Sequence, residues 1–229
     1  MSDWGARIGA AVGPVEEAEP PLPGGGPSGE TPLLVVVYGP PGSGKTTLAN
    51  GVAARLGLAH FDKDEFKDLL FERLGVADRN WSARVGAASW ELLVLCTDRL
   101  LRNGVSLVIE SNVRPDAPIV GQLRHLAAVV PATILGIYVN AADDVLWERF
   151  DARRRSRHPG HARYERRGEF VAALAEAAHG PIDFGGPSLM LDTSTAWPQL
   201  DEVTAWILTA HAEHSGAGHS GAESQTAEP

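Results

Sequence analysis

The segment from residue 33 to residue 57 constrains the fold more than any other part of the chain. The apolar, β-branched run Leu33–Tyr38 predicts a buried strand, and Lys45–Leu56 predicts a helix that ends at Gly57. Between them, Gly39–Thr46 matches the pattern GxxxxGK[ST] at every specified position. A strand, a glycine-rich loop and a helix in this order predict a phosphate-binding loop.

The residue types in this loop suit the binding of a polyphosphate. Glycine lets backbone N–H groups turn inward around the anion, and the start of the next helix adds unpaired donors and a positive dipole end. Lys45 is expected to reach the β- and γ-phosphates, and the Thr46 hydroxyl to coordinate Mg²⁺. The chain is therefore predicted to bind a nucleoside triphosphate. The predicted contacts are Gly39, Pro40, Pro41, Gly42, Ser43, Gly44, Lys45, Thr46 and Thr47.

The chain has the composition of one domain with two tails. Its 229 residues are 44% hydrophobic, which is ample for a single core. Residues 1–31 are rich in Gly, Pro and Glu, and residues 212–229 are rich in Ser, Gly, Ala, His and Glu. Both compositions predict disorder, so the folded domain is expected at residues 32–211.

Composition also limits the location and the partners. No apolar run approaches the roughly 20 residues of a membrane span, and no secretory signal is visible. Cys96 is the single cysteine, which excludes an intramolecular disulfide and fits the reducing cytoplasm, where we expect the protein. The net charge of −9 argues against a nucleic-acid partner, because backbone binding needs clustered cations.

Strands and helices alternate along the predicted domain. Further strands are expected at residues 58–61, 105–109, 133–139 and 188–191, and further helices at residues 65–74, 82–102, 118–127, 142–155 and 198–210. This alternation predicts an α/β fold with a five-stranded parallel sheet covered by helices on both faces. Ligands of such sheets bind beyond the carboxyl ends of the strands.

Carboxylates follow two of the predicted strands. Asp62 and Asp64 come after the second strand, where a carboxylate can accept a hydroxyl proton or orient the hydroxyl for attack. Glu110 comes directly after the third strand, where we expect an acid that holds Mg²⁺ through water.

An arginine-rich stretch spans residues 149–167 and holds eight of the 20 basic residues of the chain. Such a patch on an acidic protein favours a compact anionic ligand over a polymer. Arg149 and Arg153 are four residues apart on one helix face, and Arg157 follows in the next loop. The other members are Arg154, Arg155, Arg163, Arg166 and Arg167.

Together these motifs resemble the P-loop small-molecule kinases, which include chloramphenicol phosphotransferase, the zeta toxins and the kinase domain of polynucleotide kinase. The resemblance rests on Gly39–Thr46, Asp62–Lys67, Val108–Asn112 and the arginine-rich stretch, and it covers nearly the whole predicted domain. It implies a P-loop NTPase fold with an arginine-rich lid, a Mg²⁺ cofactor, and ATP or GTP as phosphoryl donor. ATP is the default, because the guanine-reading Asn-Lys-x-Asp motif is missing.

The resemblance also implies roles on the acceptor side. Asp64 matches the general base, with Asp62 as the alternative, and both are expected near the substrate. Lys67 stands where polynucleotide kinase has an arginine, and Asn112 matches an acceptor-site asparagine. The acceptor pocket is expected to include Phe66, residues 81–90 and Arg114.

On the nucleotide side, the arginines resemble those of the family's lid. Arg149 and Arg153 are expected to contact the nucleotide, while Arg153 and Arg157 neutralise charge on the transferred group. Thr193 follows the fifth strand, in a loop that lies against the nucleobase in the family. His158 and His161 are expected to serve the lid loop rather than to ligate a metal.

The leading hypothesis is a kinase that transfers the γ-phosphoryl group of a nucleotide to a hydroxyl of a small molecule. An antibiotic such as chloramphenicol or capuramycin is one candidate acceptor, which would make the protein a resistance phosphotransferase. The alternatives are a polynucleotide kinase, a zeta-toxin-like sugar-nucleotide kinase, and an ATPase that acts without an acceptor.

Overall fold

The computed structural model describes residues 31–153, 155, 157–161, 164–177 and 180–217 of the chain. Apart from Thr31, the N-terminal segment that the sequence predicts to be disordered lies outside these residues, and so do residues 218–229, Arg154 and Arg163. In the described part no helix has the length and apolar character needed to cross a membrane.

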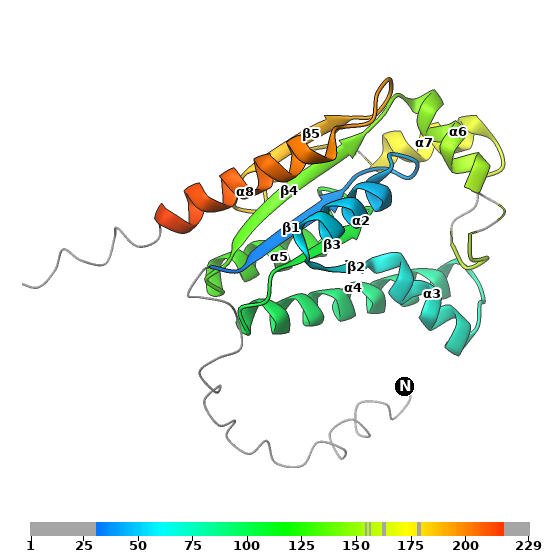
Figure 1. Ribbon diagram of the computed structural model, residues 1–229. Coiled ribbons are helices and arrows are strands. Elements are labelled where there is room, and N and C mark those ends of the chain that lie inside the picture. The colour runs from blue at the N-terminus through cyan, green and yellow to red at the C-terminus, as the bar shows by residue number, and fades with distance from the viewer. Residues whose placement is uncertain (1–30, 154, 156, 162–163, 178–179, 218–229) are drawn as a thin grey trace, which may run out of the picture.

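Strands and helices alternate as predicted (Figure 1). The strands are β1 (Leu33–Tyr38), β2 (Ala59–Asp62), β3 (Leu107–Ser111), β4 (Thr133–Asn140) and β5 (Ser188–Asp192). The helices are α2 (Lys45–Leu56), α3 (Lys63–Leu74), α4 (Arg79–Arg102), α5 (Pro118–Val129), α6 (Asp143–Arg153), α7 (Arg167–Ala177) and α8 (Leu200–Ala217).

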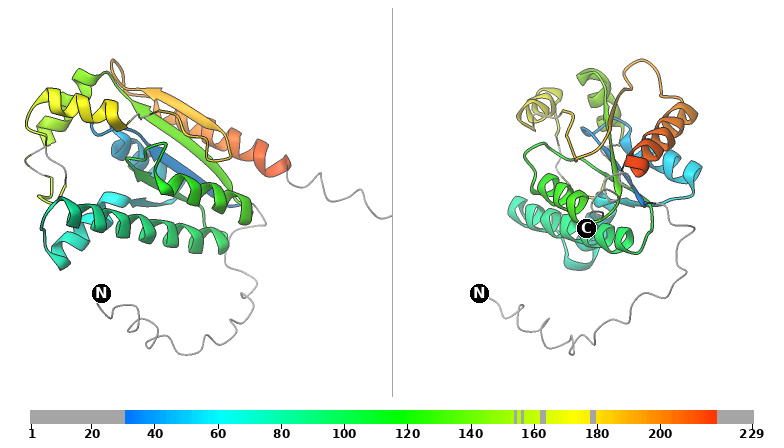
Figure 2. Two further views of the ribbon diagram at one scale, coloured as in Figure 1. Left: turned by 180° about the vertical axis from the view of Figure 1, so that it is seen from behind. Right: turned by 90° about the vertical axis from the view of Figure 1, so that its left-hand side faces the viewer.

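The five strands form one all-parallel sheet in the order β2-β3-β1-β4-β5. The central strand β1 is buried along its whole length and alternates between two cores. Leu34, Val36 and Tyr38 pack on the side of α4 and α5, whereas Leu33, Val35 and Val37 pack on the side of α2 and α8. Figure 2 shows these helix pairs on opposite faces of the sheet, so the predicted fold class is confirmed.

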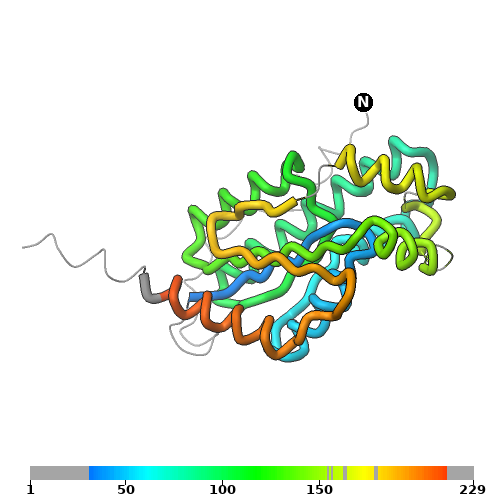
Figure 3. The backbone as a smooth tube through the Cα atoms, turned by 90° about the horizontal axis from the view of Figure 1, so that it is seen from above, coloured from blue at the N-terminus to red at the C-terminus, as the bar shows by residue number. Residues whose placement is uncertain are grey.

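A smaller third core joins α6 to α7. Phe150 of α6 stacks on Phe170 of α7 with ring centroids 4.8 Å apart, and Leu146 and Ala141 complete this cluster. Viewed from above, these two helices lie beyond the strand ends, at the same end as the loop before α2 (Figure 3). Helix α6 ends within the arginine-rich stretch, and α7 begins at its last arginine.

Three expectations about the elements were wrong. Strand β3 reaches Ser111, so Glu110 lies inside the strand, because its ladder with β1 continues through the pairs Val37–Glu110 and Tyr38–Ser111. Helix α7 is absent from the prediction, which placed no helix between the one expected at residues 142–155 and the strand expected at residues 188–191. Helix α8 continues to Ala217, beyond residue 210 where the helix was expected to end.

Candidate active site

The loop between β1 and α2 is shaped by glycines whose backbone conformation would strain any other residue. Gly44, the N-cap of α2, has a φ of 88°, and an added Cβ would lie 2.5 Å from a ring carbon of Trp197. Gly42 has a φ of 90°, and a Cβ there would lie 2.3 Å from the carbonyl oxygen of Leu146. Left-handed φ and close packing both require glycine, so the motif is a backbone requirement as well as a sequence pattern.

Lys45 and Thr46 converge on the buried Glu110, which is 2% exposed. The Thr46 hydroxyl donates to Glu110 Oε2 over 3.0 Å, and Lys45 Nζ lies 3.6 Å from Oε1. A hydroxyl and a carboxylate are the oxygen ligands that Mg²⁺ accepts alongside phosphate and water. The residues at this place therefore fit the predicted metal.

Hydrogen bonds from the segment after β5 also hold the loop. Thr193, which is buried, donates from Oγ1 to the carbonyl oxygen of Ser43 over 3.0 Å. Arg149 of α6 in turn donates to Thr193 Oγ1 and to the Thr193 carbonyl oxygen, both over 2.8 Å. Thr193 and Arg149 thus hold the phosphate loop in place.

Asp62 ends β2 and pairs with Glu110 in the register of the sheet. Its side chain caps α3 by accepting from the backbone N–H of Asp64 over 2.8 Å. Burial, and then the adjacent Glu110 carboxylate, raise the pKa of Asp62 to about 8. At neutral pH this carboxyl therefore keeps its proton and is a poor proton acceptor.

Asp64 begins α3 and is surrounded by cations. Oδ1 lies 3.0 Å from Lys63 Nζ, and Oδ2 lies 3.2 Å from Arg157 Nη2. Burial opposes ionisation of this carboxyl, but Lys63, His161 and Arg157 outweigh it and hold the pKa of Asp64 well below its usual range. Asp64 is consequently ionised at neutral pH and ready to accept a proton.

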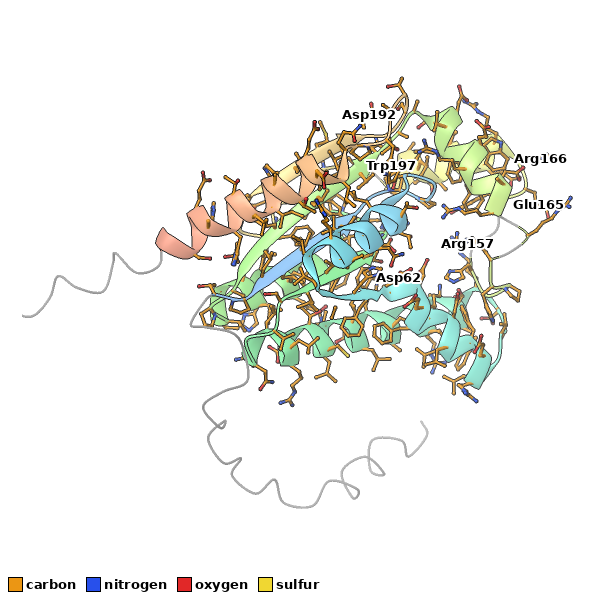
Figure 4. All side chains as sticks on the ribbon, in the orientation of Figure 1. Asp62, Arg157, Glu165, Arg166, Asp192 and Trp197 are labelled. Atoms are coloured by element: carbon orange, nitrogen blue, oxygen red, sulfur yellow. The ribbon has the colours of Figure 1, made fainter. Side chains whose placement is uncertain are left out.

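The arginine-rich stretch divides into parts with different surroundings. Arg153 and Arg157 line the same cavity as Lys45 and Asp64, whereas Arg149 is bonded to Thr193. Arg155 and Arg166 are exposed, and Arg167 pairs with Asp144 on the outer surface. Figure 4 shows Arg157 on the segment after α6, facing the end of β2 at Asp62, with Arg166 farther out.

Two neighbouring cavities at this end of the sheet share lining residues. The first, of about 410 Å³, is lined by Lys45, Thr46, Asp64, Glu110, Arg153 and Arg157. The second, of about 810 Å³, lies between α3, α4 and the segment after β3. Four residues line both: Lys67, Asn112, His161 and Tyr164.

The larger cavity matches much of the expected acceptor pocket. Helix α4 contributes Ser82, Ala83, Gly86, Ala87 and Trp90 from the expected residues 81–90, and Arg114 lines the cavity while pairing with Asp116 over 3.2 Å. Burial, and then Lys63, lower the pKa of Lys67 to about 8. Phe66 does not line this cavity, contrary to expectation. It stacks on Phe61 and packs against the core, because it lies on the sheet-facing side of α3.

The other predicted contacts take up different positions. Gly39 and Pro40 are buried, Pro41 lines the smaller cavity, and Thr47 is exposed in the first turn of α2. Within the described residues no group of three or more His, Cys, Asp or Glu side chains is arranged to hold a metal ion. His158 and His161 instead contact α3, through Phe71 and Asp68 respectively.

Sequence reasoning missed three residues that belong to this region. Tyr164 lines both cavities, Asp68 contacts His161, and Trp197 covers Gly44 while remaining 43% exposed. Asp68 lies four residues after Asp64, a spacing that places both on one helix face and could have indicated it. No local pattern marks Tyr164 or Trp197.

The strand order, the glycine loop and the pair formed by Thr46 and Glu110 define a nucleotide-binding protein of the P-loop NTPase class. Comparison with known families agrees, since residues 34–176 match the model of an AAA domain family. This match covers more than half of the chain, which therefore belongs to that family.

Solved structures extend the comparison. A "putative kinase" from Chloroflexus aurantiacus J-10-fl is 34% identical, with a TM-score of 0.72 over 79% of this chain and 99% of that chain. Kti12 from Chaetomium thermophilum, solved in complex with ADP-AlF3, is 22% identical, with a TM-score of 0.56 over 78% of this chain and 98% of that chain. At that identity the second likeness shows the fold alone. No match was found among curated proteins.

Proposed function

We propose that the protein is a kinase that transfers the γ-phosphoryl group of a nucleoside triphosphate to a hydroxyl of a small molecule. The observation that carries this proposal is that the phosphate-loop cavity and the larger cavity share part of their lining. Asp64 lies in the phosphate-loop cavity, and four residues of that cavity also line the larger one. A cavity of about 810 Å³ is within the usual range for small-molecule sites, of about 300–1,000 Å³.

The smaller cavity would bind the phosphoryl donor. Lys45 and the loop backbone would bind the phosphates, with Arg153 and Arg157 placed to offset charge on the transferred group. Thr46 and Glu110 would hold Mg²⁺, which when bound supplies positive charge next to the β- and γ-phosphate oxygens. ATP is the expected donor, and GTP is the alternative.

The acceptor half depends on Asp64. Its ionised carboxylate would take the hydroxyl proton as the new oxygen–phosphorus bond forms and the bond to the leaving diphosphate breaks. In the ligand-free protein Arg157 pairs with this carboxylate, and a γ-phosphate would compete for the same guanidinium. Nucleotide binding would thereby free Asp64 for the acceptor. Asp62 is less suited to this role, because its raised pKa keeps it protonated.

The identity of the acceptor is part of the proposal. The overall charge of −9 favours a small molecule over a polynucleotide, and an antibiotic acceptor is a hypothesis that rests on the family resemblance alone. A test would incubate the full chain with Mg²⁺ and γ-labelled ATP or GTP. The acceptor panel would hold sugars, nucleosides, chloramphenicol, capuramycin and a 5′-hydroxyl oligonucleotide. Label should move to a small hydroxylated compound.

A cavity variant makes the test specific. Gly86 of α4 lines the larger cavity, and an added Cβ would lie 3.6 Å from Lys67 Nζ, an ordinary contact, so the site tolerates a methyl group and a longer side chain would take up cavity space. Gly86→Leu should raise the acceptor KM about tenfold or more, because a substrate that fits the pocket poorly loses about 1–3 kcal/mol of binding free energy. The nucleotide KM should stay unchanged, and Gly86→Ala serves as the control. Phosphate release that no acceptor changes would instead identify an ATPase.

A further inference from the structure

The turn from His158 to His161 is built into the acceptor side of the site. Gly160 is buried so close to Phe71 that an added Cβ would lie 2.4 Å from a ring carbon. The His158 ring stacks on the same Phe71 with centroids 5.2 Å apart, and Ser82 Oγ donates to the Gly160 carbonyl oxygen over 2.8 Å. These contacts fix the position of the next residue, His161.

The His161 ring lies between two carboxylates of α3. Its Nε2 is 2.5 Å from Asp68 Oδ1, and its Nδ1 is 3.9 Å from Asp64 Oδ2. Asp64 and Asp68 are one turn apart, so a single ring can reach both. The His161 side chain is only 7% exposed, which limits competition from water.

This geometry selects one tautomer of the ring. An ionised Asp68 can only accept, so Nε2 carries the proton and donates it to Oδ1. Nδ1 is then unprotonated and directs its lone pair toward Asp64. A distance of 3.9 Å is longer than a hydrogen bond, as is common for catalytic groups before substrates bind.

We propose that His161 is the residue to which Asp64 passes the proton that it takes from the acceptor hydroxyl. The proton moves from the hydroxyl to Asp64 as phosphoryl transfer occurs, and then from Asp64 to Nδ1 of His161. The resulting imidazolium is stabilised by Asp68, and loss of its proton to solvent resets the site. No other reactant is needed. This inference rests on the proposed function, because it assigns the fate of the proton in that reaction.

The charges around the ring are consistent with this transfer. The groups that face His161 are Asp64 and Asp68 from α3 and Arg157 from the segment after α6, with Lys67 lining both cavities beside it. Burial, helped by Arg157 and opposed by the two carboxylates, lowers the pKa of His161. The ring is therefore neutral at pH 7. The cations around Asp64 make that carboxyl a poor holder of a proton, so the nearby imidazole is the stronger base.

A measurement on the ring itself tests the proposal without any kinase assay. Nitrogen-15 NMR of the full chain should show His161 with the proton on Nε2. Asp68→Asn should lower the pKa of His161, because the Asp68 carboxylate raises it. A ring protonated on Nδ1, or a pKa that Asp68→Asn leaves unchanged, would overturn the relay.

Kinetics supply the second test. His161→Gln keeps an amide that can donate to Asp68 but cannot accept the proton, so turnover should fall about 10²-fold with an unchanged nucleotide KM. The fall of kcat toward low pH, where His161 becomes protonated, should also disappear. The exposed His125→Gln is the matched control. Wild-type turnover and a wild-type pH profile in His161→Gln would refute the relay. A wild-type protein that phosphorylates no acceptor would refute the proposed function, and the NMR result alone would then test the arrangement of His161.

Discussion

The phosphate loop and the α3 side of the site are held together by different forces. The loop is fixed by glycine conformation, by packing against Leu146 and Trp197, and by the buried hydrogen bond from Thr193 to Ser43. Asp64, by contrast, is held by ion pairs with Lys63 and Arg157. The donor half is thus preformed by backbone and packing, while the acceptor half depends on charges that a bound phosphate can redistribute.

Asp64→Asn should produce the largest effect, and this effect should fall on turnover, which depends on the acceptor half of the site. The substitution removes the proton acceptor and should lower turnover by about 10²–10⁴-fold. Nucleotide affinity should stay near that of the wild type, because the preformed loop is untouched. Steady-state kinetics and nucleotide titration on the same preparation separate the two. Full turnover in Asp64→Asn together with a loss in Asp62→Asn would show that the base is Asp62.

Thr193→Val should damage the preformed half instead. Valine has a similar shape but removes the hydroxyl that Arg149 Nη1 and the Ser43 carbonyl oxygen both bond, at a cost of about 1–3 kcal/mol. The melting temperature should fall by about 2–4 °C for each kcal/mol, and nucleotide affinity should fall with it. Thr193→Ser keeps the hydroxyl and should behave as the wild type. Equal thermal denaturation curves for Val and wild type would show that this bond does not hold the loop.

Asp62→Asn should give the smallest effect, on stability alone. With its pKa raised to about 8, Asp62 contributes stability that is fully present below the ordinary aspartate pKa of about 3.9. That contribution is lost as pH rises through about 8. Asparagine keeps the oxygen that caps α3 but cannot ionise. The melting temperature of the ligand-free variant should therefore gain on the wild type between about pH 4 and about pH 8, and the difference should level off above that.

The control for this pH effect is Asp78→Asn, which changes the corresponding cap of α4. Asp78 accepts from Trp81 N over 2.8 Å at an exposed position, without a carboxylate partner like Glu110 in the strand register. The pH curves of Asp78→Asn and the wild type give the reference against which the gain of Asp62→Asn is measured. Parallel pH curves for Asp62→Asn and the wild type would contradict the description of the carboxyl pair.

The sequence predicted the phosphate loop better than it predicted the α3 side of the site. The loop, β1 and α2 were predicted with the correct bounds, because glycine requirements and apolar periodicity are local signals. The end of β3 was misplaced, because Glu110 belongs to the strand only through its ladder with β1 and β2. The pairing of Thr193 with Ser43 joins residues 150 positions apart, and no local pattern reports it.

The acceptor side shows the same limit. Asp64, Lys67 and Asn112 were placed correctly near one another by motif resemblance, and the structure puts all three on the smaller cavity. Phe66 was misassigned, since the face that a short helix turns to the core depends on its partners. The contact of His161 with Asp68 spans 93 positions and depends on how the segment after α6 folds back onto α3.

The account depends most directly on nucleotide binding by the loop. Titration calorimetry of the full chain with Mg²⁺ and ATP, and then with GTP, should give saturable binding of one nucleotide per chain. Lys45→Ala should abolish or greatly weaken this binding, while Arg55→Ala, on the exposed side of α2, should not change it. No detectable binding of either nucleotide, or equal binding by wild type and Lys45→Ala, would contradict the account.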